Sequence, residues 1–178
     1  GDGAIIQHSG RGKETVDGNK MSDITIENTG GGSDFILLLV NSAGNSIVTN
    51  NTIGSAAANN ILDKADRVLW GIFHQGTGTL TCTGNTIQQI KAENTGTLHT
   101  FYSIAAQGGE ATIQNNIIRD ITSLSTGAAT RIFGINITSS AVTNSIKSNN
   151  ITNLHCATTA ASTPYSIGIF ADVGSGTI

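Results

Sequence analysis

Residues 145–154 read SIKSNNITNL, and this pattern of a short polar run, an asparagine and an apolar residue two positions later recurs along the chain. Earlier copies are TVDGNKMSDI (15–24), SIVTNNTIGSA (46–56), TCTGNTIQQI (81–90) and TIQNNIIRDI (112–121). The shared asparagines are Asn19, Asn51, Asn85, Asn116 and Asn149, separated by 32, 34, 31 and 33 residues. So regular a period is typical of a solenoid in which each repeat forms one coil.

Apolar residues keep fixed distances from these asparagines. Three positions before them stand Val16, Val48, Cys82, Ile113 and Ile146, and two positions after them stand Met21, Ile53, Ile87, Ile118 and Ile151. Five positions after them come Ile24, Ala56, Ile90, Ile121 and Leu154. This spacing alternates as in strands and shows no helical period. Each repeat therefore predicts short strands separated by turns.

A second block recurs with the same period and predicts a longer strand of six or seven residues. Its copies include FILLLVN (35–41), LWGIFHQ (69–75), FYSIAAQ (101–107) and IFGINIT (132–138). Its middle column is Gly3, Leu37, Gly71, Ser103, Gly134 and Gly168, followed by Ala4, Leu38, Ile72, Ile104, Ile135 and Ile169. Stacking each coil on the next, at about 4.8 Å per rung, would pair the backbone groups of every strand. The sequence predicts an all-β parallel β-helix of about five coils of three strands, in one domain over residues 1–178.

The Asn-x-Ile pattern resembles the right-handed, single-stranded parallel β-helix of the pectate-lyase-like superfamily, along the whole chain. That resemblance implies three sheets and an asparagine ladder, Asn19 to Asn149, in the turn between the second and third strands. We expect each ladder asparagine to take the left-handed backbone conformation that a tight turn needs. The ladder would be structural, because stacked amides can hydrogen-bond to one another. A fold resemblance of this kind carries little information about activity.

Net charge, the length of the apolar runs and the cysteine spacing argue against several classes of function. The net charge of −3 is spread along the chain, which argues against nucleic-acid binding. The longest apolar run, FILLLV at 35–40, is far too short for a membrane span. Cys82 and Cys156 form neither a zinc-binding spacing nor a disulfide framework, and the four histidines fall in different columns. We therefore expect no metal centre.

One loop carries most of the candidate ligand-binding residues. The segment AANNILDKADR (57–67) holds Asp63, Asp66 and Arg67, and Glu93 stands in the equivalent loop of the next repeat. The resemblance implies acidic residues, and sometimes calcium, beside the first sheet, so these four residues could line a groove for a sugar or a cation. A solvated loop with local ion pairs is the simpler interpretation. No catalytic motif of polygalacturonases or pectate lyases is present, so the sequence assigns no catalytic residue and favours a non-enzymatic role.

Two further features are open. Asn50, Asn136 and Asn150 begin N-x-[ST] sequons, which arise easily in a chain so rich in Asn and Thr. Thr81 and Thr83 form one Thr-x-Thr rung of the kind that ice-binding solenoids repeat. Its neighbours Ile47/Thr49, Thr112/Gln114 and Ser145/Lys147 interrupt such an array.

The long strands also predict a partner. If Leu38 and its column point inward, alternation turns the neighbouring residues outward, with the glycine column as a shallow channel between them. The predicted interface is Phe35, Leu37, Leu39, Leu69, Phe73, Phe101, Ile132 and Phe170. An exposed apolar stripe on a soluble protein indicates a partner surface.

The favoured function is a structural or adhesive solenoid, secreted or at the cell surface. It would associate with itself, end to end or laterally, in a fibre, sheath or surface layer, or would contact flanking domains of the same chain. No cap sequence is visible at either end. The main alternative is a carbohydrate-active β-helix, a lyase, hydrolase or tailspike-like depolymerase acting on polysaccharide, and an ice-binding solenoid is a minor one.

Overall fold

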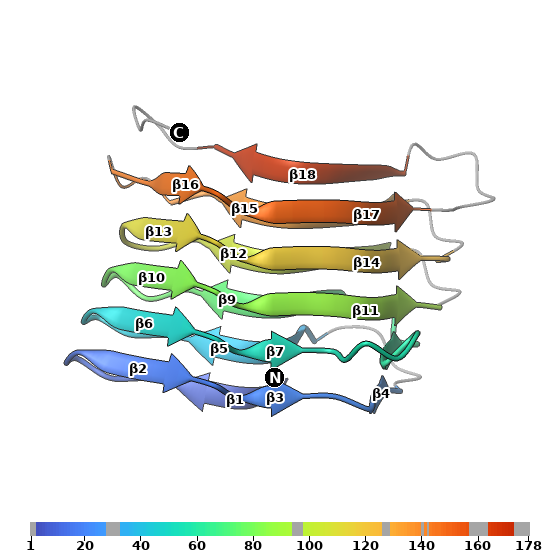
Figure 1. The fold of residues 1–178 in the computed structure, drawn as a ribbon, viewed down its shortest axis with the longest axis horizontal. Coiled ribbons are helices and arrows are strands. Elements are labelled where there is room, and N and C mark those ends of the chain that lie inside the picture. Colours follow the sequence, from blue (N-terminus) through green and yellow to red (C-terminus); the bar gives the residue numbers. More distant parts are fainter. Residues whose placement is uncertain are drawn as a thin grey trace.

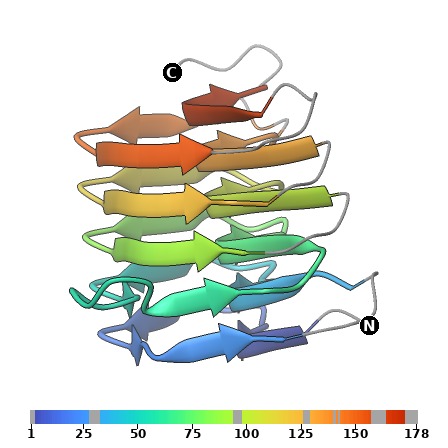
Figure 2. The ribbon, with the colours of Figure 1, turned by 90° about the vertical axis from the view of Figure 1, so that its right-hand side faces the viewer.

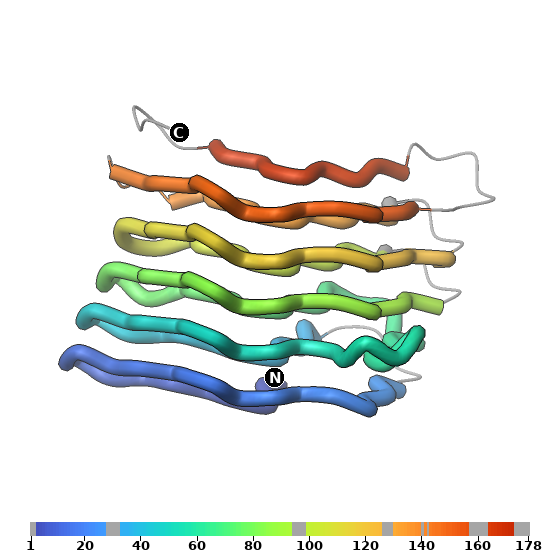
Figure 3. Tube along the Cα trace, viewed as in Figure 1, coloured from blue at the N-terminus to red at the C-terminus, as the bar shows by residue number. Residues whose placement is uncertain are grey.

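The computed structural model describes residues 3–27, 33–93, 98–125, 129–139, 141, 143–156 and 164–172, which stack as parallel coils into a β-solenoid of about five turns (Figure 1). The coils follow one another from the N-terminal to the C-terminal end without crossing, as the Cα trace also shows (Figure 3). No helix occurs among these described residues, so none of them forms a helix that could span a membrane. The predicted all-β parallel solenoid is confirmed.

Three parallel sheets form the walls of the solenoid (Figure 2). The first sheet contains the long strands: β1 (Gly3–His8), β5 (Phe35–Val40), β9 (Val68–His74), β12 (Leu98–Ala106), β15 (Ala129–Ile137) and β18 (Tyr165–Ala171). The second contains β2 (Glu14–Asp17), β6 (Ser46–Thr49), β10 (Leu80–Thr83), β13 (Ala111–Gln114) and β16 (Ser145–Lys147). The third contains β3 (Lys20–Met21), β4 (Ile24–Ile26), β7 (Thr52–Ile53), β8 (Ile61–Asp63), β11 (Thr86–Ala92), β14 (Ile117–Ser123) and β17 (Asn150–Cys156).

The asparagine ladder runs through the turn between the second and third sheets. From the second coil onward, each ladder Oδ1 accepts two hydrogen bonds of 2.9–3.0 Å from the asparagine of the preceding coil, one from its backbone N–H and one from its Nδ2. The Nδ2 atoms also donate to backbone carbonyls of the second-sheet strand in the preceding coil. Asn116 does so to the Cys82 carbonyl of β10 at 3.0 Å. The ladder thus satisfies polar groups that would otherwise be buried without partners.

The left-handed residue of this turn is not the ladder asparagine. Positive φ angles occur one position earlier, at Gly18, Asn50, Gly84, Asn115 and Ser148. The prediction that the ladder residues themselves adopt this conformation is therefore wrong. The ladder side chain has to point into the turn to reach its neighbours, and the preceding residue supplies the change of chain direction.

Pairing corrects two alignments. Ala4 pairs with Ile36, and Ile6 pairs with Leu38, so the first repeat was aligned two residues out of register. In the second repeat Ile61, and not Ala56, stands beside Ile24 and Ile90 in the third sheet. The extra residues of this coil lie between β7 and β8, where a fixed count from the asparagine no longer finds the strand.

The strands of the first sheet share a bend at which two consecutive residues face the interior. Pairing between β5 and β9 includes Ile36 and resumes at Leu38, skipping Leu37. Leu37 and Leu38 are nevertheless both completely buried in the same interior cluster. The glycines that occupy the Leu37 position in other long strands also lie on the inner side. A Cβ on Gly134, for example, would lie 3.0 Å from the Ile151 side chain, which packs against the core. Strict alternation is therefore broken once in every long strand.

Five of the eight residues of the predicted partner interface face the interior. Leu37, Leu69, Phe101 and Ile132 are 0–1% exposed and belong to the interior cluster, against which Phe35 also packs. Leu39 and Phe73 do belong to the outer face, and Phe170 shares their column. On the described strands the glycine column forms no outer channel, because it lies on the inner side of the bend.

Candidate functional site

The outer face of the first sheet carries a continuous aromatic stack that the sequence did not reveal. Trp70 stacks on Phe73 and Tyr102 with ring centroids 4.2 and 4.3 Å apart, and Tyr102 stacks on Phe133 at 4.8 Å. Phe133 then meets Phe170 edge-on at 5.8 Å. Because the strands place equivalent residues one rung apart, rings in one column come into contact without any further element.

Polar residues flank this stack. Trp70 donates from Nε1 to Asp34 at 3.0 Å, and the Arg131 guanidinium lies 5.3 Å from the Tyr165 ring centroid. Burial raises the pKa of the Tyr102 hydroxyl, an effect that the nearby Arg131 opposes. Trp70 and Phe73 are only 7% and 5% exposed. The rings therefore bury one another. Phe73, which the sequence predicts in an exposed apolar stripe, is consequently almost inaccessible to solvent.

The predicted loop residues do not converge. Asp63 ends strand β8 and is completely buried, so its prediction as a solvent-facing ligand residue is wrong. Glu93 pairs with Lys91 at the surface, and Lys64 pairs with Glu27 at 2.9 Å. These two contacts agree with the local ion pairing expected of a solvated loop.

Asp66 and Arg67 are partly exposed beside the start of β9. Among the described residues no three His, Cys, Asp or Glu side chains lie close enough together to hold a metal ion. Residues 94–97 of the neighbouring loop lie outside the described part of the chain. Calcium binding stays a prediction.

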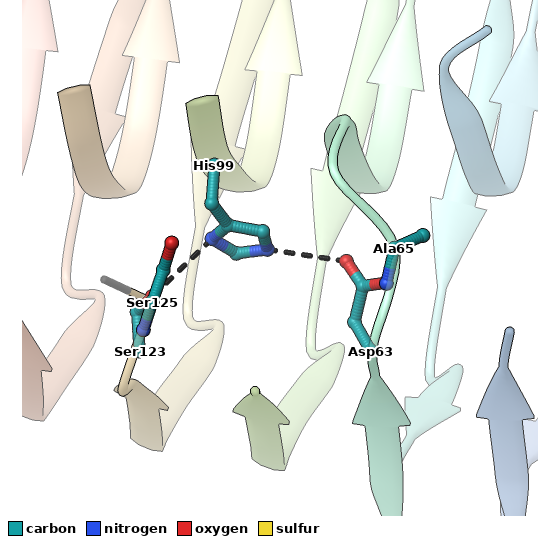
Figure 4. A network of polar contacts seen from close by, with 5 residues as sticks. All are labelled: Asp63, Ala65, His99, Ser123 and Ser125. Atoms are coloured by element: carbon teal, nitrogen blue, oxygen red, sulfur yellow. Dashed lines mark hydrogen bonds and ion pairs between the residues drawn. The ribbon is translucent and has the colours of Figure 1, made fainter. Parts of the chain in front are cut away.

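Asp63 instead belongs to a polar network inside the corner between the third and first sheets (Figure 4). Its Oδ2 lies 3.1 Å from Nε2 of His99, and its Oδ1 accepts a 2.9 Å hydrogen bond from the Ala65 N–H. On the far side of the imidazole, Nδ1 of His99 lies 3.4 Å from Oγ of Ser123, to which the Ser125 N–H also donates at 3.4 Å. The three side chains come from β8, β12 and β14 and span successive coils.

The third sheet explains how these residues meet. Its last inward column reads Ile26, Asp63, Ala92, Ser123 and Cys156. The small Ala92 stands between Asp63 and Ser123, and the imidazole of His99 lies between the same two residues (Figure 4). A correct alignment of the second repeat, through Ile61, would have placed Asp63 in this inward column.

The hydrogen-bond roles follow from donor chemistry. An ionised carboxylate only accepts, so Nε2 of His99 carries the proton that points to Asp63. In the neutral imidazole Nδ1 then accepts from the Ser123 hydroxyl. The line of carboxylate, imidazole and hydroxyl matches the general logic of an activated nucleophile. All three side chains are at most 1% exposed, however, so in this arrangement the network fixes a corner of the fold and offers no hydroxyl to a substrate.

No protein-family model matches the chain, and neither a similar curated protein nor a matching solved structure was found. The structure supports the solenoid and its repeat of about 32 residues. The likeness to the pectate-lyase-like superfamily stays a resemblance.

Proposed function

We propose that this chain is a structural solenoid outside the cell. Its coils would stack on further coils to form a fibre, sheath or surface layer. The observation that carries the proposal is the continuity of its ladders. The asparagine bonds and the aromatic stack each run over successive coils, and the network of Ser123, His99 and Asp63 is buried in the interior.

The exposed apolar residues favour contacts along the solenoid axis over lateral ones. Tyr165, Ile169 and Phe170, all on β18, are 37%, 46% and 38% exposed. Trp70, Phe73 and Phe133 of the middle coils are at most 7% exposed, so they offer little area to a lateral partner. A further coil over β18, from a second copy or from flanking residues of the same protein, would bury these side chains and pair the strand edge.

Sedimentation velocity and electron microscopy of the chain at micromolar concentration test the proposal. We expect concentration-dependent species that lengthen along the solenoid axis. Ile169→Lys should weaken this association, whereas Leu124→Lys, a matched change at a residue that is 40% exposed beside β14, should leave it intact. A uniform monomer at all concentrations, or equal effects of the two variants, would contradict self-assembly.

A carbohydrate-binding role is the second candidate, and the aromatic outer face with its Asp34 and Arg131 flanks is the observation that favours it. Stacked aromatic and charged groups on one face are a common setting for sugars. Trp70 is the single tryptophan of the chain, so its fluorescence reports directly on this face. Titration with oligosaccharides, with and without calcium, should shift the emission if sugar binds there. An unchanged spectrum and no ordered sugar at residues 56–67 or 91–99 would leave the structural proposal alone.

A further inference from the structure

His74 occupies an unusual position in the first sheet. It ends strand β9 and is completely buried, in the column where Val40 stands in the preceding coil and Ala106 in the following one. Its Nε2 lies 3.1 Å from the carbonyl oxygen of Gly78, across the turn that leads into β10. Its Nδ1 is buried without any hydrogen-bond partner in the described structure.

No counter-charge faces this imidazole from the elements around it. Its column neighbours in β5 and β12 are apolar, and His8, two coils away in β1, is held by Glu14 at 2.9 Å. In its own coil the second sheet points Cys82 inward, and burial raises the pKa of that thiol to about 12, so it is uncharged. The titratable side chains of the last inward column of the third sheet are Asp63, which His99 and Ala65 occupy, and Cys156.

Protonation of His74 would therefore create two problems at once. The new Nδ1–H would meet only the Val40 carbonyl, which already accepts from the Gln75 N–H, and the positive charge would lie in an apolar interior with only carbonyl dipoles to stabilise it. The turn beside it, residues 75–79, carries no apolar side chain, and most of its bonds to the preceding coil are made by its backbone. The Gln75 N–H donates to the Val40 carbonyl at 3.0 Å, and the Gly78 N–H donates to the Ser42 carbonyl at 3.1 Å.

We propose that His74 is an acid-sensitive switch that opens the turn at residues 75–79 of the third coil while the neighbouring coils stay folded. Local opening exposes the imidazole to water and gives both ring nitrogens hydrogen-bond partners, at less cost than global unfolding. Opening would also break backbone hydrogen bonds between the second and third coils, in the middle of the solenoid.

The direction of the pH dependence follows from burial. Desolvation lowers the pKa of His74 below its ordinary value of 6.5, and the Gly78 and Val40 carbonyls, which favour the protonated ring, offset this only in part. The closed turn thus binds the proton less well than the open one. The stability of the closed turn is complete above about pH 6.5 and is lost progressively as the pH falls below that value.

Hydrogen exchange followed by mass spectrometry tests this on the intact chain. Between about pH 7.5 and about pH 5, after correction for intrinsic exchange, the amides of residues 75–79 should open more, by up to about tenfold per pH unit below 6.5. Amides of β13 and β14, one coil away, should not change. His74→Val, which copies Val40 of the adjacent coil, should abolish the effect, and His155→Gln, at an exposed histidine, should preserve it.

Three results would overturn the proposal: no excess opening of the turn in acid, equal opening in the His74→Val variant, or simultaneous exchange of all coils. A measurement on the unmodified protein covers the case in which the variant fails to fold. In an NMR titration of the imidazole Cε1–H signals, the His74 signal should stay in its neutral position below pH 6.5. Titration of His74 at or above 6.5 in the folded chain would refute the switch.

Discussion

His74 and His99 are both buried, one at the corner that leads from the first sheet to the second and the other at the corner that leads from the third to the first. His99 has a partner on each ring nitrogen, Asp63 and Ser123, whereas His74 has a carbonyl on Nε2 and makes no hydrogen bond through Nδ1. The Ser123 hydroxyl can accept as well as donate, so Nδ1 of His99 has a hydrogen-bond partner in either role. Partners, more than burial, decide whether an ionisable side chain holds a corner or weakens it.

The largest effect should come from placing a carboxylate in the core without the partners that Asp63 has. Ile135 is completely buried in the interior cluster, so Ile135→Asp should prevent folding, since an unpaired buried charge costs several kcal/mol. Circular dichroism and solubility measure this. Ile135→Val is the matched control and should stay folded, with a loss of about 1 kcal/mol. A soluble Ile135→Asp variant that melts with wild type would show that the strand register is wrong.

Removing the imidazole that serves Asp63 should have the next largest effect. His99→Leu leaves the buried carboxylate with only the Ala65 N–H, so we expect a loss of about 3–5 kcal/mol in urea unfolding. Replacing both partners, Asp63→Ile with His99→Leu, should recover much of that loss, because no charge is then buried. Ile26 already occupies the equivalent position in the first coil. A double variant as unstable as the single one would mean that packing, not charge pairing, dominates this corner.

The His74 corner depends on glycine more than on side chains. A Cβ on Gly78 would lie 1.8 Å from the Gly44 carbonyl oxygen of the preceding coil, so Gly78→Ala has to displace backbone. We expect a loss of about 3 kcal/mol by urea unfolding, monitored through Trp70 fluorescence. Gly12→Ala is the control, since no atom lies within 4 Å of its Cβ. Equal stability of the two variants would show that the coils can separate at this turn at little cost.

The asparagine ladder is a third kind of buried polar group, satisfied on every side and repeated in each coil. Asn116→Leu removes the acceptor of two Asn85 donors and the donor to the Cys82 carbonyl, so it should cost about 1–3 kcal/mol. Asn116→Gly should be no milder, because the left-handed residue is Asn115 and glycine brings no conformational relief. A glycine variant clearly more stable than the leucine variant would point to strain at Asn116 itself.

The smallest effect should be a gain. Ser148 has a φ of 56°, in the left-handed region, where its equivalents are Gly18, Asn50, Gly84 and Asn115. Ser148→Asn should stabilise the fifth coil by about 0.5 kcal/mol, since asparagine tolerates this conformation better than serine. Thermal unfolding of the variant measures the gain, and a lower midpoint would show that the Ser148 side chain has a role of its own.

The candidate sites were much harder to predict than the fold. The sequence pattern predicts Asp63 as a solvent-facing loop residue, because the residues inserted between β7 and β8 hide its strand. Its partner His99 is 36 residues away and its further neighbour Ser123 lies another 24 residues along the chain. Neither spacing matches the repeat. His74 gave no signal at all, since what distinguishes it is a missing partner.

The period, the parallel stacking and the asparagine ladder follow from the sequence alone, because each depends on residues at fixed separations that one coil imposes on the next. The direction in which the long strands face depends on the packing of the folded chain. The bend beside Leu37 turns two consecutive residues inward, which buries Phe101 and Ile132 and moves Trp70, Tyr102 and Phe133 to the outer face. A period of two cannot report such a bend, since every side chain after it is shifted by one residue, and the bend is set by how the stacked backbones pack together.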